Sequence, residues 1–215
     1  MKTNQLLFTL LAATNFAIPG VGAAEMSASA TAPVVDGADI ANYGAATGTD
    51  KWWPENSAGA GSAKGQTFTT GDLKVSLNSI TYQISGTQQA EPTKEYTIRV
   101  CSISGNELFE IHRETAVQTF KWNSGEYMTW TFDEPVRLEA NTVYAIDVAI
   151  TSSTSSWQTG IPYITMTGDN YAGGSRYTSG RNGAGSPQFN KDSRRDRVFH
   201  LDLDYLPHGF QLILE

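Results

Sequence analysis

The residues best suited to binding chemistry are aromatic side chains in stretches of turn-forming sequence. Trp52 and Trp53 lie in a stretch rich in Gly, Ala and Ser, and Trp157 follows a run of Ser and Thr. An exposed indole or phenol ring offers an apolar face on which a sugar ring can stack, while polar neighbours bind the hydroxyls. Such rings bury about 150–250 Å² each, so they could instead cover the open end of a core. Both interpretations stay open, and the carbohydrate-binding candidates are Trp52, Trp53, Trp157, Tyr163 and Arg176.

A basic cluster precedes the last predicted strand. It contains Lys191, Arg194, Arg195 and Arg197. The planar guanidinium group of arginine is suited to bidentate pairing with oxyanions. The cluster is therefore either a contact for uronate or sulfate groups or a solvated turn.

Side-chain spacings typical of catalysis are missing from the sequence. Glycoside hydrolysis uses two carboxyl groups about 5 Å or about 6.5–9.5 Å apart across one bond. Asp202 and Asp204 share one face of a predicted strand, but that face lies opposite their apolar neighbours and is expected to be solvated. His112, His200 and His208 have none of the spacings of zinc sites, and no nucleophile elbow precedes a helix. We therefore expect a protein that is not an enzyme.

Calcium is the metal for which the sequence offers ligands. Calcium binds hard oxygen ligands such as loop carboxylates, which can pin the ends of an extracellular sandwich. No EF-hand or repeat spacing selects among the available carboxylates, so a structural calcium is one option and no cofactor is certain. The candidate ligands are Asp36, Asp39, Asp147, Asp202 and Asp204.

The elements that must position these side chains are strands. Apolar and polar residues alternate over residues 96–101, 143–150 and 199–205, which indicates strands with one buried face. Turn-forming residues separate such segments, as at 104–106 and 123–125. The sequence predicts an all-β protein, an antiparallel β-sandwich of jelly-roll type with about eight or nine strands. Two Gly-rich stretches are predicted as long loops, residues 44–65 and residues 169–197.

The chain divides into four segments by composition. Lys2, an apolar run over residues 6–18, the helix-breaking Pro19 and small residues up to Ala24 are typical of a secretory signal peptide. Cleavage is expected after Ala23 or Ala24, and Ala30 offers a less favoured later site. The predicted segments are a signal peptide (1–24), a linker (25–34), a β-sandwich domain (35–205) and a C-terminal tail (206–215). We expect a secreted, extracellular protein, with the periplasm and the cell surface as alternatives.

Charge and cysteine content exclude several partners. The 215-residue chain has a net charge of −7 and a single cysteine, Cys101, so no intramolecular disulfide can form. An acidic surface repels phosphate backbones and anionic lipids, which argues against nucleic acid and membrane partners. The apolar stretch near the C-terminus is shorter than the ~18 residues of a membrane span, so no membrane insertion is expected. The oligomeric state stays open.

The order of strand and turn patterns between residues 40 and 205 resembles one family. The chain is similar to the jelly-roll modules of exported bacterial proteins, of the choice-of-anchor and carbohydrate-binding-module-like kind. The resemblance implies a module of a kind that often accompanies carbohydrate-active domains or sorting tails, and many such modules have no assigned activity. The matching segments are residues 65–71, 77–81, 96–100, 135–148, 171–180 and 197–203.

Three functions follow, in order of preference. The first is a secreted, non-catalytic module that binds a polysaccharide or other glycan through its loop aromatics. The second is a structural or protein-interaction module of the cell surface or extracellular matrix. The third is an unrecognised polysaccharide-active enzyme. Exposed aromatic rings favour the first function over the second, because a structural role would leave those rings buried.

Overall fold

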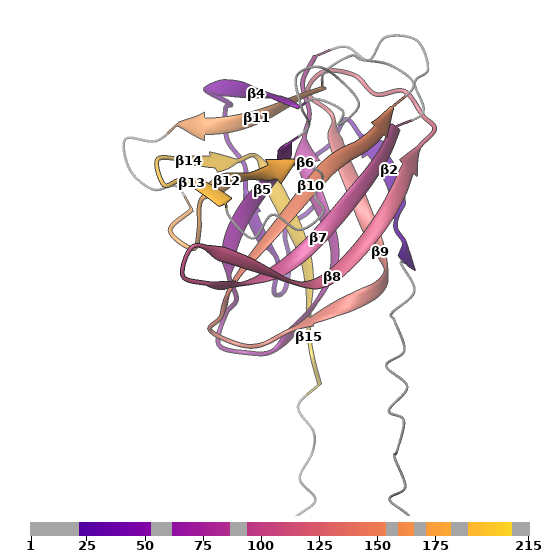
Figure 1. The fold of residues 1–215 in the computed structure, drawn as a ribbon. Coiled ribbons are helices and arrows are strands. Elements are labelled where there is room, and N and C mark those ends of the chain that lie inside the picture. Colours follow the sequence, from indigo (N-terminus) through magenta and orange to yellow (C-terminus); the bar gives the residue numbers. More distant parts are fainter. Residues whose placement is uncertain are drawn as a thin grey trace, which may run out of the picture.

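The computed structural model describes residues 22–52, 62–86, 94–153, 159–165, 171–181 and 189–207 (Figure 1). These residues form strands and contain no helix, so the all-β prediction is confirmed. In chain order the strands are β1 (Gly22–Ala23), β2 (Glu25–Ser29), β3 (Ile40–Asn42), β4 (Gly48–Trp52), β5 (Ser62–Thr69), β6 (Val75–Gln83), β7 (Lys94–Ser104), β8 (Glu107–Gln118), β9 (Tyr127–Leu138), β10 (Val143–Ser153), β11 (Thr159–Thr165), β12 (Arg176–Arg181), β13 (Phe189–Asp192), β14 (Arg195–Arg197) and β15 (Phe199–Tyr205).

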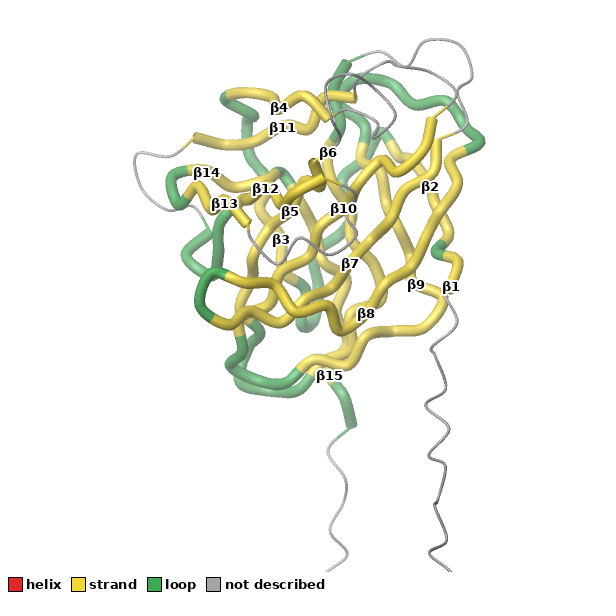
Figure 2. Tube along the Cα trace, viewed as in Figure 1, coloured by secondary structure: helices red, strands yellow, loops and turns green. Residues whose placement is uncertain are grey.

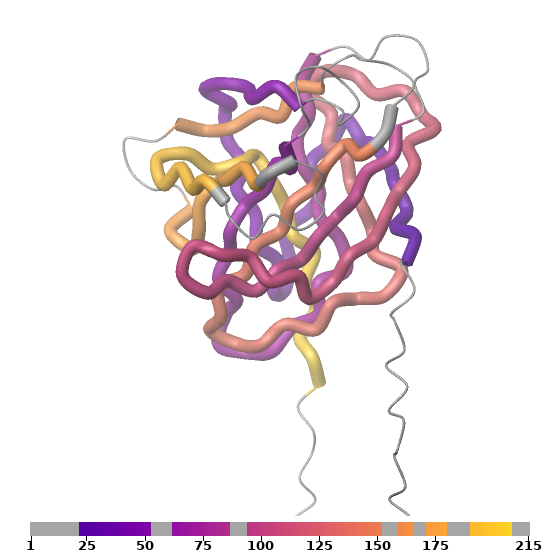
Figure 3. Tube along the Cα trace, viewed as in Figure 1, coloured from indigo at the N-terminus to yellow at the C-terminus, as the bar shows by residue number. Residues whose placement is uncertain are grey.

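The strands form two large sheets and one small sheet (Figure 2). The seven-stranded sheet has the order β1-β8-β7-β10-β5-β12-β13, and the five-stranded sheet has the order β2-β9-β6-β15-β3. A three-stranded sheet has the order β14-β11-β4. Figure 3 shows how this small sheet joins distant parts of the chain, with the early strand β4 in purple beside the late strand β11 in orange.

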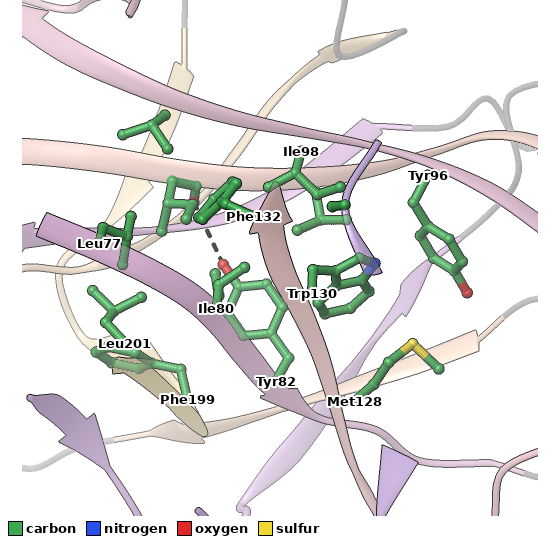
Figure 4. Close-up of a cluster of buried hydrophobic side chains, with 14 of the residues drawn as sticks. Leu77, Ile80, Tyr82, Tyr96, Ile98, Met128, Trp130, Phe132, Phe199 and Leu201 are labelled. Atoms are coloured by element: carbon green, nitrogen blue, oxygen red, sulfur yellow. Dashed lines mark hydrogen bonds between the residues drawn. The ribbon is translucent and has the colours of Figure 1, made fainter. Parts of the chain in front are cut away.

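Aromatic side chains fill the space between the two large sheets (Figure 4). Trp130 on β9 has its ring centroid 5.5 Å from that of Tyr96 on β7 and 6.1 Å from that of Tyr82 on β6. The Tyr82 hydroxyl donates a hydrogen bond to the carbonyl oxygen of Ile146 on β10, at 3.4 Å. The two large sheets therefore pack face to face as a sandwich, as the alternating apolar pattern predicted.

A smaller apolar cluster lies on the opposite face of the seven-stranded sheet. Cys101 on β7 is fully buried there and packs with Leu108, Ala145 and Tyr177. The same face carries a buried ion pair, in which Arg99 Nε and Nη2 donate to the two carboxylate oxygens of Asp147 at 2.9 and 2.6 Å. This pairing explains how polar residues that alternate with core residues can be buried as well.

The strands expected from alternation are present, and further strands lie in regions expected to be loops. Segments 96–101, 143–150 and 199–205 fall in β7, β10 and β15, and both predicted turns occur, with Gly105 and Gly125 at φ 60° and 93°. The described residues contain fifteen strands rather than eight or nine. The added strands are short and polar. β4, β13 and β14 are edge strands, and β12 lies between β5 and β13. The loop predictions are corrected at β4, β12, β13 and β14.

The predicted linker is corrected at its start. Residues Glu25–Ser29 form β2, which pairs antiparallel with β9 in a register that places Met26 opposite Trp130. Met26 and Ala28 pack against the core, which explains why a stretch of small residues is ordered. The β-structure therefore begins before residue 35. Its last strand ends at Tyr205. Residues 1–21 of the predicted signal peptide lie outside the described residues, whereas Gly22–Ala23 form β1 and Ala24 is buried in the core.

No helix among the described residues has the length and apolarity needed to cross a membrane.

Candidate functional site

A dense group of buried and partly buried charged side chains lies where the three-stranded sheet approaches β5 and β12 of the seven-stranded sheet (upper left in Figure 1). Tyr163 on β11 pairs with Gly48 on β4 and with Arg197 on β14, which fixes the register of the small sheet. Arg176 on β12 pairs with Gln66 on β5 in the large sheet. We refer to Asp50, Tyr163, Arg176, Arg195 and Arg197 as the arginine cluster.

Two guanidinium groups lie over the ring of Tyr163. The Cζ atom of Arg176 is 4.2 Å from the ring centroid, and that of Arg195 is 4.8 Å away. Cations over an aromatic face are attracted by its negative quadrupole, which holds both arginines in place. Gly48 makes room for this ring, because a Cβ atom at that position would collide with the Tyr163 phenol.

Two carboxylates tie the arginines together. Asp50 accepts hydrogen bonds from Arg197 Nη1, at 2.7 Å, and from Arg176 Nη1. Asp192 accepts from Arg176 Nη2 at 3.1 Å and pairs with Arg195 at 3.3 Å. Burial would raise the pKa of Asp50, but the charge of Arg197 and the hydrogen bonds from Arg176 outweigh burial and hold that pKa below its ordinary value.

Beneath the arginine cluster, β5 contributes a second layer of polar side chains. Gln66 donates from Nε2 to Asp196 at 2.8 Å and accepts from the backbone N–H of Arg197 at 2.9 Å. Lys64, two residues earlier on the same face of β5, is only 8% exposed and donates from Nζ to Ser62 Oγ at 3.0 Å. Lys64 has no carboxylate partner among the described residues.

The electrostatics of this region favour an anion. Burial, and then the charge of Arg197, lower the pKa of Lys64 to about 8. Asp50 opposes this shift, and Arg176 adds to it less strongly. The Nε atoms of Arg176 and Arg197 are buried, and neither has a hydrogen-bond partner in the part of the chain that the structure describes. Positive charges therefore outnumber carboxylates here, and several donors are unused.

The structure brings together two of the five predicted carbohydrate-binding residues. Tyr163 is half-buried, and Arg176 lies over its ring. Trp52, in contrast, is fully buried, with its ring centroid 5.6 Å from that of Tyr96 and 6.0 Å from that of Trp130. The packing interpretation therefore applies to Trp52, and its assignment to a sugar-binding surface is corrected.

The other predicted site residues have mixed outcomes. Trp53 and Trp157 lie outside the described residues. The residues of the basic cluster predicted before the last strand differ in burial. Arg194 is exposed, Arg195 is partly exposed and Arg197 is fully buried. A solvated turn therefore describes Arg194 and does not describe Arg197.

Lys64 and Asp50 were not expected in the site. Asp50 lies in a stretch so rich in glycine that it was predicted as a loop, and Lys64 precedes the apolar residues that identified β5. Neither position carries a motif. In the sequence, each of the two is only an isolated charged residue, and most such residues lie on a solvated surface, so neither could be predicted as part of a site.

Four of the five aspartates considered for calcium have protein partners for their carboxylates, while Asp36 bonds through its backbone, whose N–H donates to the Asp39 carboxylate. Asp147 pairs with Arg99 and accepts hydrogen bonds from Tyr177 and Ser179, both at 3.1 Å. Asp39 pairs with His200 at 2.9 Å, and Asn78 donates to Asp202 and Asp204. Within the described ranges, no three His, Cys, Asp or Glu side chains are grouped so as to hold a metal ion. Structural calcium therefore stays a prediction, with no grouping of these carboxylates among the described residues to support it.

Comparison with known proteins gives little further information. No protein-family model and no curated protein matches the chain. One solved structure shows a partial likeness, the cysteine protease and lectin-like domains of Cwp84, a surface layer associated protein of Clostridium difficile. The two are 10% identical, with a TM-score of 0.42, and the match covers 68% of this chain and 33% of that one. A likeness this weak supports no inference about function.

Proposed function

We propose that the protein is a secreted, non-catalytic module that binds polysaccharide at the arginine cluster. The observation that carries this proposal is the convergence of Tyr163 and Arg176, which come from different strands and lie 4.2 Å apart, measured from guanidinium carbon to ring centroid. Arg195 joins them with about a third of its side chain exposed. Fixed guanidinium groups at a partly exposed position suit the recognition of polar sugar groups.

The geometry changes the expected mode of contact. Sugar stacking on a free tyrosine face was the basis of the sequence prediction, but the Tyr163 ring is already in contact with two guanidinium groups. We therefore assign the ring a positioning role and give the hydrogen-bonding role to the arginines. The proposal includes export by the signal peptide, the jelly-roll type of the sandwich and membership of the choice-of-anchor kind of module.

A protein-interaction role is the second candidate, and it has an observation of its own. Phe109 and Ile111, close together on β8, are 49% and 47% exposed. Large apolar side chains gathered on one exposed strand are a common feature of interaction surfaces. A role as a structural or interaction module of the cell surface would use β8 and leave the arginine cluster without a ligand.

The test compares two arginines of similar exposure. Arg195 has a side chain 34% exposed and pairs with Asp192, whereas Arg113 on β8 has a side chain 29% exposed and pairs with Glu110. We expect Arg195→Ala to reduce retention of the purified protein in polysaccharide-containing affinity gels, and Arg113→Ala to leave retention unchanged. Both variants should keep nearly the wild-type melting temperature, because exposed ion pairs contribute only about 0–1 kcal/mol.

Two results would contradict the proposal. One is the absence of retention on every neutral, uronic and sulfated polymer. The other is an equal loss of retention in the Arg195→Ala and Arg113→Ala variants, since that result would indicate a nonspecific charge effect. Retention that falls only on changing Phe109 or Ile111 would point to β8 instead.

A further inference from the structure

We infer that the ligand of the arginine cluster is an anionic sugar whose carboxylate or sulfate oxygens bind between Lys64, Arg176 and Arg195. This inference rests on the proposed function and specifies its ligand class. Three observations support it: an unpaired buried lysine, unused guanidinium donors and a shortage of carboxylates. Each is a property of residues that the structure describes.

Lys64 is the first observation. A lysine ammonium can donate three hydrogen bonds, and Lys64 makes one, to the Ser62 hydroxyl. Only 8% of the residue is exposed, so water compensates little of its charge. A buried charge without an opposite partner is costly, and proteins seldom keep one without a role. An oxyanion would supply both the missing charge and the missing acceptors.

The guanidinium groups are the second observation. Arg176 is 8% exposed, Arg197 is fully buried, and the Nε atom of each lacks a hydrogen-bond partner among the described residues. A buried donor left without an acceptor costs about as much as a lost hydrogen bond. Because Arg176 also lies over the Tyr163 ring, its guanidinium plane is held in one orientation.

The supply of carboxylates is the third observation. Asp50 is shared between Arg176 and Arg197, and Asp192 is shared between Arg176 and Arg195. Asp50 and Asp192 therefore serve three arginines. The buried Asp196 accepts a hydrogen bond from Gln66, and among the described residues Lys64 has no hydrogen-bonded carboxylate. A neutral sugar hydroxyl could accept hydrogen bonds here, but it could not balance the excess charge. A charged sugar should thus bind more tightly than a neutral one of similar size.

The positions of these residues favour a single site. Lys64 and Gln66 lie on the same face of β5, and β12 places Thr178 opposite Lys64 and Arg176 opposite Gln66. Arg176 reaches Asp50 on β4, across the junction between the sheets. The cations thus gather at one end of the sandwich, although the chain as a whole has a net charge of −7.

The experiment measures binding of the purified full-length protein to three polymers. Polygalacturonate supplies carboxylates, dextran sulfate supplies sulfate esters, and dextran is the neutral control. We expect one or both anionic polymers to bind at least about tenfold more tightly than dextran, as an added charged hydrogen bond allows. The polymer that binds more tightly identifies the source of the oxyanion.

Two lysine variants test the site itself. Lys64→Met removes the unpaired charge at similar volume and should weaken binding of the anionic polymer by about tenfold. Lys94→Met is the matched control, because Lys94 is also buried, at 2% exposed, and among the described residues donates to one hydroxyl, that of Thr159 at 2.7 Å, with no arginine acting on its charge. We expect Lys94→Met to bind like the wild type.

A pH series on the wild-type protein keeps the test independent of variant folding. Asp50, Arg176 and Arg197 are the charged groups that act on Lys64, whose pKa lies at about 8. Affinity for the anionic polymer should therefore fall as pH rises from about 7 to about 9.5, while Lys64 loses its proton. Lys94→Met should show the same fall.

The possible failures can be told apart. Equal binding of dextran and the anionic polymers would overturn the inference and leave the proposed function in place. Binding of none of the three would overturn the inference, and the wider gel survey would then decide the proposed function. Wild-type affinity in a folded Lys64→Met variant, or an affinity independent of pH, would exclude Lys64 from the site.

Discussion

At the scale of single residues, Trp52 gives the sharpest test of what is core. The side chain has no exposed area, and its ring lies near those of Tyr96 and Trp130. Trp52→Ala should lower the free energy of unfolding by about 3–5 kcal/mol, because truncating a buried aromatic ring leaves a cavity. Denaturant unfolding followed by far-UV circular dichroism measures this loss. A variant as stable as the wild type would show that Trp52 is not packed as described.

Lys94 links a buried charge to the pH dependence of stability. Burial lowers the pKa of its ammonium group to about 8, below the ordinary value of 10.5. Between these two values the unfolded chain binds more protons than the folded protein, so stability rises with pH across that window. We expect the melting temperature of the wild type to increase relative to that of Lys94→Met between pH about 8 and about 10. A constant difference between the two proteins would contradict this assignment.

Single residues also show where sequence reasoning succeeds. Tyr163 and Arg176 could be predicted as site residues, because an aromatic ring and a guanidinium group in polar stretches are unusual enough to notice. Trp52 could not be distinguished from an exposed ring, since burial depends on the strands that surround it. Lys64 could not be predicted, because nothing local separates a buried lysine from a solvated one.

At the scale of strands, Gly65 and Tyr177 form a cross-strand contact that can be tested. The two residues are paired between β5 and β12, and a Cβ atom at Gly65 would overlap the Tyr177 ring, whose hydroxyl donates to Asp147. Gly65→Ala should therefore displace the ring and destabilise the protein by about 1–3 kcal/mol. Thermal unfolding measures the effect. Gly71→Ala is the control, since no atom lies within 4 Å of its Cβ position.

An equal effect of the two glycine changes would contradict the role of the Tyr177 contact. If the contact matters, Gly65→Ala should also expose Asp147, which is buried with Arg99. Gly65→Ala would then lower the free energy of unfolding by more than the steric overlap alone would, because a buried ion pair tolerates little rearrangement.

The strands that could be predicted from the sequence are those that bury an apolar face, because only these show an alternation of apolar and polar residues. β7, β10 and β15 alternate apolar and polar residues because one face of each meets the core. β4 and β14 carry the polar residues Asp50 and Arg197 where alternation would require apolar ones. Their pairing is stabilised by buried ion pairs, which leave no periodic pattern in the sequence.

At the scale of the whole molecule, the first strands bear on where the predicted signal peptide would be cleaved. The Ala24 N–H donates to the carbonyl oxygen of Thr115 at 2.8 Å, and β2 pairs with β9 directly afterwards. We expect the intact mass of the mature protein to correspond to a chain that begins at Ala24, which loses β1 but keeps this hydrogen bond and β2. A chain that begins at Glu25 would lose the hydrogen bond as well. A chain beginning at Thr31 would lack β2 and leave one edge of β9 unpaired, so that mass would contradict the prediction.

The arrangement of the sheets is the part that sequence reasoning could not reach. Asp50 and Arg197 form an ion pair although 147 positions separate them in the chain. Alternation identifies which face of a strand is buried, but it does not identify the strand that lies alongside. The site depends on such long-range pairings, and for that reason its members were found only in part.

Cys101 has a practical consequence for measurement. It is the only cysteine in the chain, it is fully buried beside Tyr177, and burial raises the pKa of its thiol to about 12. A thiol-specific dye can react only during moments when this face of the sheet opens, because the thiolate is the reactive form. The rate at which the dye labels Cys101 in native buffer therefore reports how often this face of the sheet opens, and no cysteine has to be introduced for the measurement.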